Sequence, residues 1–109
     1  MKVSELKGQQ LAYWVARAQG WEVQRYSDRG GVIVINDSGT ANNHYSPDLD
    51  WEQCGELIEE FNVELLRLST GEWVGRRRCF NGVLSTYPKT AICRAVVDSV
   101  FGEEVDDER

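Results

Sequence analysis

The residues best suited to binding or chemistry lie in one polar segment, Tyr45-Ser46-Pro47-Asp48-Leu49-Asp50-Trp51. It follows the stretch 37–44, which shows no apolar periodicity, and an unstructured connection of this length is uncommon in a compact domain unless it binds something. Tyr45 and Trp51 offer flat aromatic surfaces on which a base or a partner's side chain can stack. The alternative, that Trp51 folds back onto the core, stays open because aromatic side chains are often mostly buried.

Two carboxylates and a histidine in this segment suggest a small hydrolase as one hypothesis. His44, Asp48 and Asp50 are close in sequence, but general base catalysis needs an activated nucleophile, which the sequence does not identify. Asp48 and Asp50 also have ordinary local roles, as turn former and helix cap. Zinc-ligand spacing and a phosphate-binding glycine loop are both absent from the sequence. We therefore expect no metal, no cofactor and no catalytic residues.

Positive charge that can hold an anion comes from arginines in the last third of the chain. Arg94 presents a guanidinium fork suited to phosphate or carboxylate, and Gln53 completes a polar set if their two helices meet. An ion pair between Arg94 and Asp98, four residues on, is the alternative. Arg76 and Arg78 belong to a run of three arginines that either attracts an anion or balances neighbouring acids. Ser46 and Asp50 complete the predicted ligand-binding set with Tyr45 and Trp51.

Hydrophobic periodicity predicts the elements that must position these residues. Apolar residues recur at helical spacing in three segments, and β-branched or alternating runs separated by turn residues form two hairpins. Asp50 is the expected cap of the second helix, and Pro88 suits the first turn of the third. The predicted order is αββαββα, over residues 7–19, 21–26, 32–36, 50–61, 63–68, 72–80 and 88–101. We expect an α+β domain in which one antiparallel sheet of about four strands packs against three helices.

Length, composition and charge limit the class of protein. A chain of 109 residues with 41% hydrophobic residues is long enough for one core, so we expect one domain over 1–102. Residues 103–109 form an acidic, flexible tail that carries −4 of the net charge of −6. The remaining body is only mildly acidic, so DNA mimicry is not expected. Because the net charge is negative, direct nucleic-acid binding is not expected either. The sequence shows no membrane span or signal peptide, and three cysteines favour reduced thiols inside a cell.

Three groups of residues resemble the NinX-like family of small lambdoid-phage and prophage proteins, a domain of unknown function. The opening resembles the family in Met1-Lys2-Val3-Ser4-Glu5-Leu6, Trp14-Val15-Ala16 and Ala18. The central motif comprises Tyr45-Ser46-Pro47, Asp50-Trp51, Gln53, Gly55, Ile58 and Glu59. The closing helix resembles the family in Pro88, Ala91, Arg94-Ala95, Val97, Ser99, Phe101-Gly102 and Glu104-Val105. Cys54 and Glu56 depart from the glycine and proline that the family tends to show there, which suggests a more helical backbone.

The resemblance implies an accessory protein that acts in the cytoplasm of an infected bacterium, and it implies no activity. We expect the protein to act by binding, with sequestration of a small anionic, nucleotide-like host defence signal as the main hypothesis. The alternatives are inhibition of a host protein through the same loop and the acidic tail, and the small hydrolase above. Exposed aromatic side chains would also suit a homodimer interface.

Overall fold

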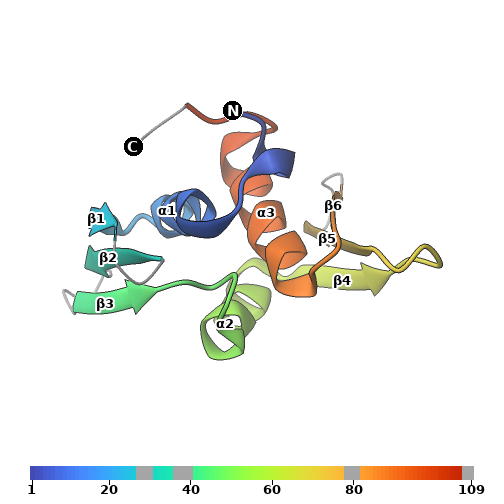
Figure 1. Cartoon of the computed structure of the whole chain (residues 1–109), viewed down its shortest axis with the longest axis horizontal. Helices are drawn as coiled ribbons and strands as arrows, with labels where there is room; N and C mark the ends of the chain where they lie inside the picture. Colours follow the sequence, from blue (N-terminus) through green and yellow to red (C-terminus); the bar gives the residue numbers. More distant parts are fainter. Residues whose placement is uncertain (27–30, 36–40, 78–81, 107–109) are drawn as a thin grey trace.

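Three helices and two small sheets make up the computed structural model, which describes residues 1–26, 31–35, 41–77 and 82–106 (Figure 1). The helices are α1 (Gly8–Ala18), α2 (Trp51–Phe61) and α3 (Pro88–Phe101), and a 3-10 turn, η1 (Val3–Glu5), precedes them. The strands are β1 (Glu22–Tyr26), β2 (Val32–Ile35), β3 (Ala41–Tyr45), β4 (Val63–Arg67), β5 (Trp73–Arg77) and β6 (Val83–Ser85). The predicted α+β class and the three helices are confirmed.

The strands form two antiparallel three-stranded sheets, ordered β1-β2-β3 and β4-β5-β6. The sheets lie towards opposite ends of the molecule, whose long dimension is 40 Å, with helices between them (Figure 1). The prediction of a single sheet of about four strands is therefore wrong. The order αββαββα is also wrong, because each predicted hairpin has a third strand in the part of the chain that the structure describes.

The two missed strands have weak sequence signals. Residues 41–44 of β3 read Ala-Asn-Asn-His, a composition that β-strands disfavour, but the buried β2 presents a free edge on which β3 pairs through its backbone. The stretch 37–44, expected to be an irregular loop, therefore contains strand from Ala41 onward; residues 37–40 lie outside the described part. β6 has only three residues, too few for a periodicity to be recognised.

α3 is the central helix of the core and packs on the inner face of the second sheet. A Cβ atom added to Gly75 in β5 would lie 2.4 Å from the Ala91 carbonyl oxygen of α3. Only a glycine permits such a close approach of helix and strand. Ile92 and Val96 of α3 are fully buried, so the helix contributes to the shared core on the sides that face α1 and α2 as well as the sheet.

The N-terminal residues lie beside the residues that follow α3 (Figure 1). The Met1 amine donates a hydrogen bond to the Val105 carbonyl oxygen at 2.7 Å, and the Val105 amide donates to the Met1 carbonyl oxygen at 2.9 Å. Val105 is only 8% exposed. The first residues of the acidic tail thus pair with the N-terminus, while residues 107–109 lie outside the described part. The division into a domain at 1–102 and a flexible tail stays a prediction.

Two of the three cysteines are described, and both are buried free thiols: Cys54 in α2 and Cys93 in α3. The prediction of reduced thiols is confirmed for these two, and Cys79 lies outside the described residues. Among the described helices, none combines the length and the apolar character needed to cross a membrane.

Candidate functional site

The loop between β3 and α2 begins in the core. Tyr45 is 3% exposed, its phenolic oxygen accepts a hydrogen bond from Gln19 Nε2 at 2.7 Å, and its ring packs edge-on against Trp21 at 5.0 Å between centroids. Burial raises the pKa of the Tyr45 hydroxyl. The ring therefore anchors the loop and presents almost no surface to solvent, so it cannot stack on a ligand in this conformation.

The polar residues of the loop hold its own backbone. The Ser46 amide donates to Gln53 Oε1 at 2.7 Å, and the Ser46 carbonyl accepts from the amides of Leu49 and Asp50. Asp50 Oδ1 accepts from the Glu52 amide at 2.9 Å, so the predicted helix cap is confirmed. These contacts give Ser46, Asp50 and Gln53 structural roles that fix the start of α2.

Arg94 connects α3 to two neighbouring segments. Its Nε donates to the Leu6 carbonyl at 2.8 Å and its Nη1 donates to the Leu84 carbonyl at 3.2 Å. Burial lowers the pKa of the guanidinium. The side chain predicted to bind an anion thus donates to carbonyls from the N-terminal segment and from β6.

The arginine run of β5 lies on the second sheet. Arg76 Nε forms an ion pair with Glu64 Oε1 at 2.9 Å, and Arg77 donates to the Phe61 carbonyl at 2.8 Å and to Ser99 Oγ at 3.1 Å. Arg78 lies outside the described residues. The structure does not bring Arg76 or Arg94 to the same cavity as Trp51.

Trp51 lines a different feature, which we call the aromatic groove. It has a volume of about 820 Å³ and is formed where the N-terminal ends of α1 and α3 meet the loop before α2 and its first residue. Its lining residues are Lys7, Gly8, Gln10, Asp48, Leu49, Trp51, Tyr87, Pro88, Lys89 and Thr90. Trp51, a predicted site residue and the first residue of α2, therefore lies beside groups from the starts of α1 and α3.

Aromatic rings and a cation are exposed together in this groove. Trp51 is 51% exposed and Tyr87 69% exposed, which is unusual for such large rings. Lys89 Nζ lies 5.0 Å from the centroid of the Trp51 ring, within the range of a cation–π contact. The alternative that Trp51 folds back onto the core is thus excluded, and its ring is held beside an ammonium group.

The start of α3 adds partial positive charge to the groove. No side chain caps this helix, whose first residue is Pro88, whereas α2 is capped by Asp50. Backbone N–H groups at a helix start favour an anion, and Pro88 has none to offer, so those of Lys89 and Thr90 are the first available. The Lys89 side chain and the helix start therefore favour the same sign of ligand charge.

Asp48 brings a carboxylate to the same groove. Burial raises its pKa, although its hydrogen bond from the Gly8 backbone and the nearby Lys89 charge both act in the opposite direction. A carboxylate in this position repels a bare phosphate but accepts hydrogen bonds from hydroxyl or amino groups. The groove is thus suited to a ligand that carries both an anionic group and hydrogen-bond donors.

A reactive nucleophile is not exposed in the described part of this groove. The Cys54 thiol has a pKa lowered mainly by its hydrogen bond with Cys93, but Cys54 is 0% exposed. Burial raises the pKa of Cys93 well above its ordinary value. The side chain of His44 lies outside the described residues.

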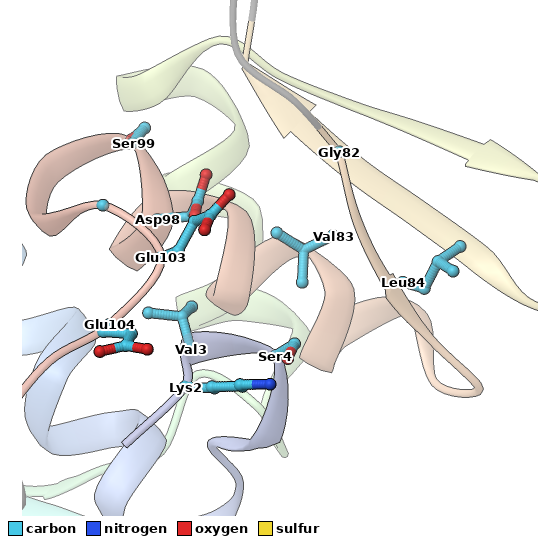
Figure 2. A pocket seen from close by; sticks show the side chains of 11 residues that line it. Lys2, Val3, Ser4, Gly82, Val83, Leu84, Asp98, Ser99, Glu103 and Glu104 are labelled. Atoms are coloured by element: carbon cyan, nitrogen blue, oxygen red, sulfur yellow. The ribbon is translucent and has the colours of Figure 1, made fainter.

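A second cavity, which we call the acidic cleft, lies between the N-terminal turn, β6 and the end of α3 (Figure 2). Its volume is about 830 Å³, and its lining includes Lys2, Asp98, Glu103 and Glu104. The carboxyl groups of Asp98 and Glu103 lie close together (Figure 2). Burial and then the Glu103 charge raise the pKa of Asp98, so this cleft disfavours an anion. Among the described residues, no three potential ligands are grouped to hold a metal ion.

Sequence reasoning missed Tyr87, Lys89 and Lys7. A signal was available, because Lys89 falls in the first turn of a predicted helix, where the helix dipole makes a cation unfavourable. An exposed tyrosine directly before Pro88 is a second signal. Together they mark this helix start as a place where an anion would relieve unfavourable charge.

The chain matches the family model described as bacteriophage P22, NinX, over residues 2–99. No curated protein sequence matches the chain. The matched region includes every residue of the aromatic groove. Since the match spans most of the 109 residues, the chain belongs to the phage P22 NinX family.

Proposed function

We propose that this phage protein acts by occupancy, binding and sequestering a small anionic, nucleotide-like molecule in the aromatic groove. The observation that carries the proposal is the convergence of the exposed Trp51 and Tyr87 rings with Lys89 and the uncapped start of α3 in one cavity. Aromatic surfaces take up a base, and the cationic helix start takes up a phosphate.

Each part of such a ligand has a matching group. Stacking of one base on an aromatic ring contributes about 1–3 kcal/mol, and a charge-assisted hydrogen bond from Lys89 contributes about 1.5–3 kcal/mol. Asp48 accepts a hydrogen bond from a sugar hydroxyl or a base amino group. This combination favours a nucleotide over inorganic phosphate, which has no aromatic base to stack on the rings.

Membership of a phage family supports the biological setting that we propose. A phage accessory protein that binds without catalysis acts by lowering the free concentration of its ligand, and a nucleotide-like defence signal in the cytoplasm of the infected host is the ligand class we propose. The net charge of −6 opposes long-range attraction of anions, so selectivity must come from the local contacts of the groove.

Inhibition of a host protein is a second candidate, because the groove also exposes Leu49, at 65%, beside Trp51 and Tyr87. Tryptophan and tyrosine are the side chains that most often dominate the binding energy of protein interfaces. A partner's side chain inserted into the groove would contact all three.

One experiment separates these functions. Purified protein is mixed with a panel of linear and cyclic nucleotides, and the free pool is chromatographed before and after heat denaturation of the protein. We expect one nucleotide to disappear from the free pool and to return intact after heating. Return of an altered nucleotide would indicate hydrolysis instead, and a pool that never changes would overturn the proposal in favour of a protein partner.

A further inference from the structure

Two buried thiols meet where α2 packs against α3. Cys54 of α2 and Cys93 of α3 are fully buried and belong to the shared core. The Cys54 thiol donates to the Lys89 carbonyl oxygen, with Sγ at 3.9 Å. Within an α-helix this oxygen also accepts the amide hydrogen of the residue four positions on, which is Cys93. The sulfur of Cys54 therefore lies beside the turn of α3 that ends at Cys93.

The side chain of Cys93 points towards the same turn. Cβ atoms of a helix tilt towards its N-terminus, so the Cys93 side chain extends back towards Lys89, where Cys54 Sγ lies. The two thiols also share a hydrogen bond. The helix geometry and the hydrogen bond thus place the two sulfurs in contact.

Each thiol lies one helical turn from a residue of the aromatic groove. Trp51 precedes Cys54 by three residues on α2, and Lys89 precedes Cys93 by four residues on α3. Residues three or four apart are neighbours on a helix surface. Lys89 Nζ lies 5.0 Å from the centroid of the Trp51 ring. The thiol pair and the Trp51–Lys89 pair therefore join the same two helices at successive turns.

We propose that Cys54 and Cys93 form a reversible disulfide that narrows the aromatic groove, with hydrogen peroxide as the oxidant. A disulfide bond is shorter than a contact between two thiols, so it draws the first turns of α2 and α3 together. The Trp51 ring then moves towards Lys89, and a ligand loses room between them. The effect on nucleotide binding rests on the proposed function, whereas formation of the disulfide does not.

The oxidation takes two steps. The Cys54 thiolate attacks one oxygen of hydrogen peroxide and the O–O bond breaks. The leaving hydroxide takes up the proton that the Cys54 thiol released, which gives water and a Cys54 sulfenic acid. The Cys93 sulfur then attacks the Cys54 sulfur, the S–O bond breaks, and the leaving hydroxide takes the Cys93 proton as a second water. The two sulfurs lose two electrons in total, and the peroxide gains them.

The two thiols differ in a way that suits these roles. The hydrogen bond from Cys93 and the Lys89 charge lower the pKa of Cys54 against the opposing effect of burial, and the thiolate is the nucleophilic form. Burial raises the pKa of Cys93, so Cys93 stays protonated until it attacks. Because Cys54 is buried, the oxidant reaches it when the first turn of α2 opens, and a small uncharged molecule enters such an opening most easily.

Peptide mapping tests whether the disulfide forms. The parent protein is Cys79→Ser, which removes the third cysteine. After treatment with hydrogen peroxide, proteolysis without reductant should yield one linked pair of peptides that contain Cys54 and Cys93, about 2 Da lighter than the two peptides apart. Dithiothreitol should separate them. Peptides that stay unlinked, or cysteines oxidised only to sulfinic acid, would overturn the proposal.

NMR tests whether the disulfide reaches the groove. In the oxidised parent without nucleotide, Overhauser contacts between the Trp51 ring and the Lys89 side chain should strengthen. Trp73 and Arg67, which form a similar pair at 5.4 Å on the second sheet, are the matched control and should keep their contacts. A linked protein with unchanged contacts between Trp51 and Lys89 would overturn the narrowing of the groove.

Nucleotide binding is measured separately with the panel of linear and cyclic nucleotides. The oxidised parent should remove about tenfold less nucleotide from the free pool than the reduced parent. Cys93→Ala in the same parent, with folding checked by circular dichroism, should remove equal amounts before and after peroxide. Equal removal by the linked and reduced parent, or a loss on oxidation in Cys93→Ala, would overturn the switch. If the reduced parent removes no nucleotide, the proposed function fails, and peptide mapping and the Overhauser contacts still decide the disulfide.

Discussion

The aromatic groove and the acidic cleft have nearly the same volume, about 820 and 830 Å³, but opposite linings. The groove exposes two aromatic rings, two lysines and an uncapped helix start. The cleft contains Asp98, Glu103 and Glu104 with a single lysine. Two cavities of equal size in one molecule can therefore favour ligands of opposite charge, because the charges of their lining residues differ.

The two cavities differ even where they contain the same type of residue. Each holds an aspartate whose pKa is raised by burial. Asp48 in the groove faces Lys89, which partly counteracts that rise, whereas Asp98 in the cleft faces Glu103, which adds to it. An anion entering the groove thus meets a carboxylate already offset by a cation. An anion entering the cleft meets three carboxylates and one lysine, a net negative charge.

Reversing one charge in the groove should have the largest effect. Lys89→Glu removes the charge-assisted bond, the cation–π contact and the attraction to phosphate, so we expect nucleotide affinity to fall by about 3 kcal/mol, roughly a hundredfold. Isothermal titration calorimetry measures the change. Lys2→Glu makes the same change of net charge in the cleft and should leave affinity within about twofold. Equal losses in both variants would show that overall charge, and not the groove, governs binding.

Removing the stacking surface should have the next largest effect. Trp51→Ala should cost about 1–3 kcal/mol of binding free energy, with little loss of stability because the ring is 51% exposed. Trp73 is the matched control. Its ring also lies beside a cation, with Arg67 at 5.4 Å from the ring centroid, but Trp73 does not line the groove. Trp73→Ala should bind as the native protein does. Native affinity in Trp51→Ala would remove the aromatic part of the proposal.

Neutralising the aspartate of each cavity should have a smaller effect, of opposite sign, in the groove. Asp48→Asn keeps an oxygen acceptor for the Gly8 amide and removes negative charge beside the phosphate, so affinity should rise about threefold to tenfold. Asp98→Asn should not change affinity. Calorimetry at pH 7 compares the two variants, and tighter binding by Asp98→Asn alone would indicate that the ligand enters the cleft.

The smallest expected effect is on stability as a function of pH. Between the ordinary aspartate pKa of 3.8 and the raised folded value, the native state binds more protons at Asp98 than the unfolded state does. The free energy of unfolding therefore falls as pH rises through this window. Asp98→Asn removes the cost of ionising this carboxyl in the folded state. The melting temperature of the variant should therefore exceed that of the native protein slightly at pH 7 and match it at pH 3. A larger gain at pH 3 than at pH 7 would contradict the assigned sign.

Sequence reasoning recovered the parts of the fold that periodicity encodes. The three helices and the hairpin strands were predictable from apolar spacing, and Asp50 was identifiable as a cap from its position before Trp51. β3 and β6 were not, because their pairing depends on free edges of neighbouring strands that local sequence does not report. The division into two sheets depends on the same long-range pairing.

The candidate site was only partly predictable for a similar reason. Trp51 was identified, but Tyr45 and Arg94 looked like ligand-binding groups and have structural contacts with Gln19 and with the Leu6 carbonyl, which lie far away in sequence. Lys89 joins Trp51 only because the starts of α2 and α3 meet. Residue type indicated which side chains can bind an anion, and the fold determined which of them remain exposed.

A two-dimensional amide and indole NMR titration with the nucleotide that the protein retains most strongly tests directly whether the aromatic groove is the binding site. We expect shifts at the Trp51 indole and at the amides of Lys89 and Thr90, with no shifts at Asp98 or Glu103. Shifts centred on Asp98 and Glu103, or none at the groove at saturating nucleotide, would contradict it.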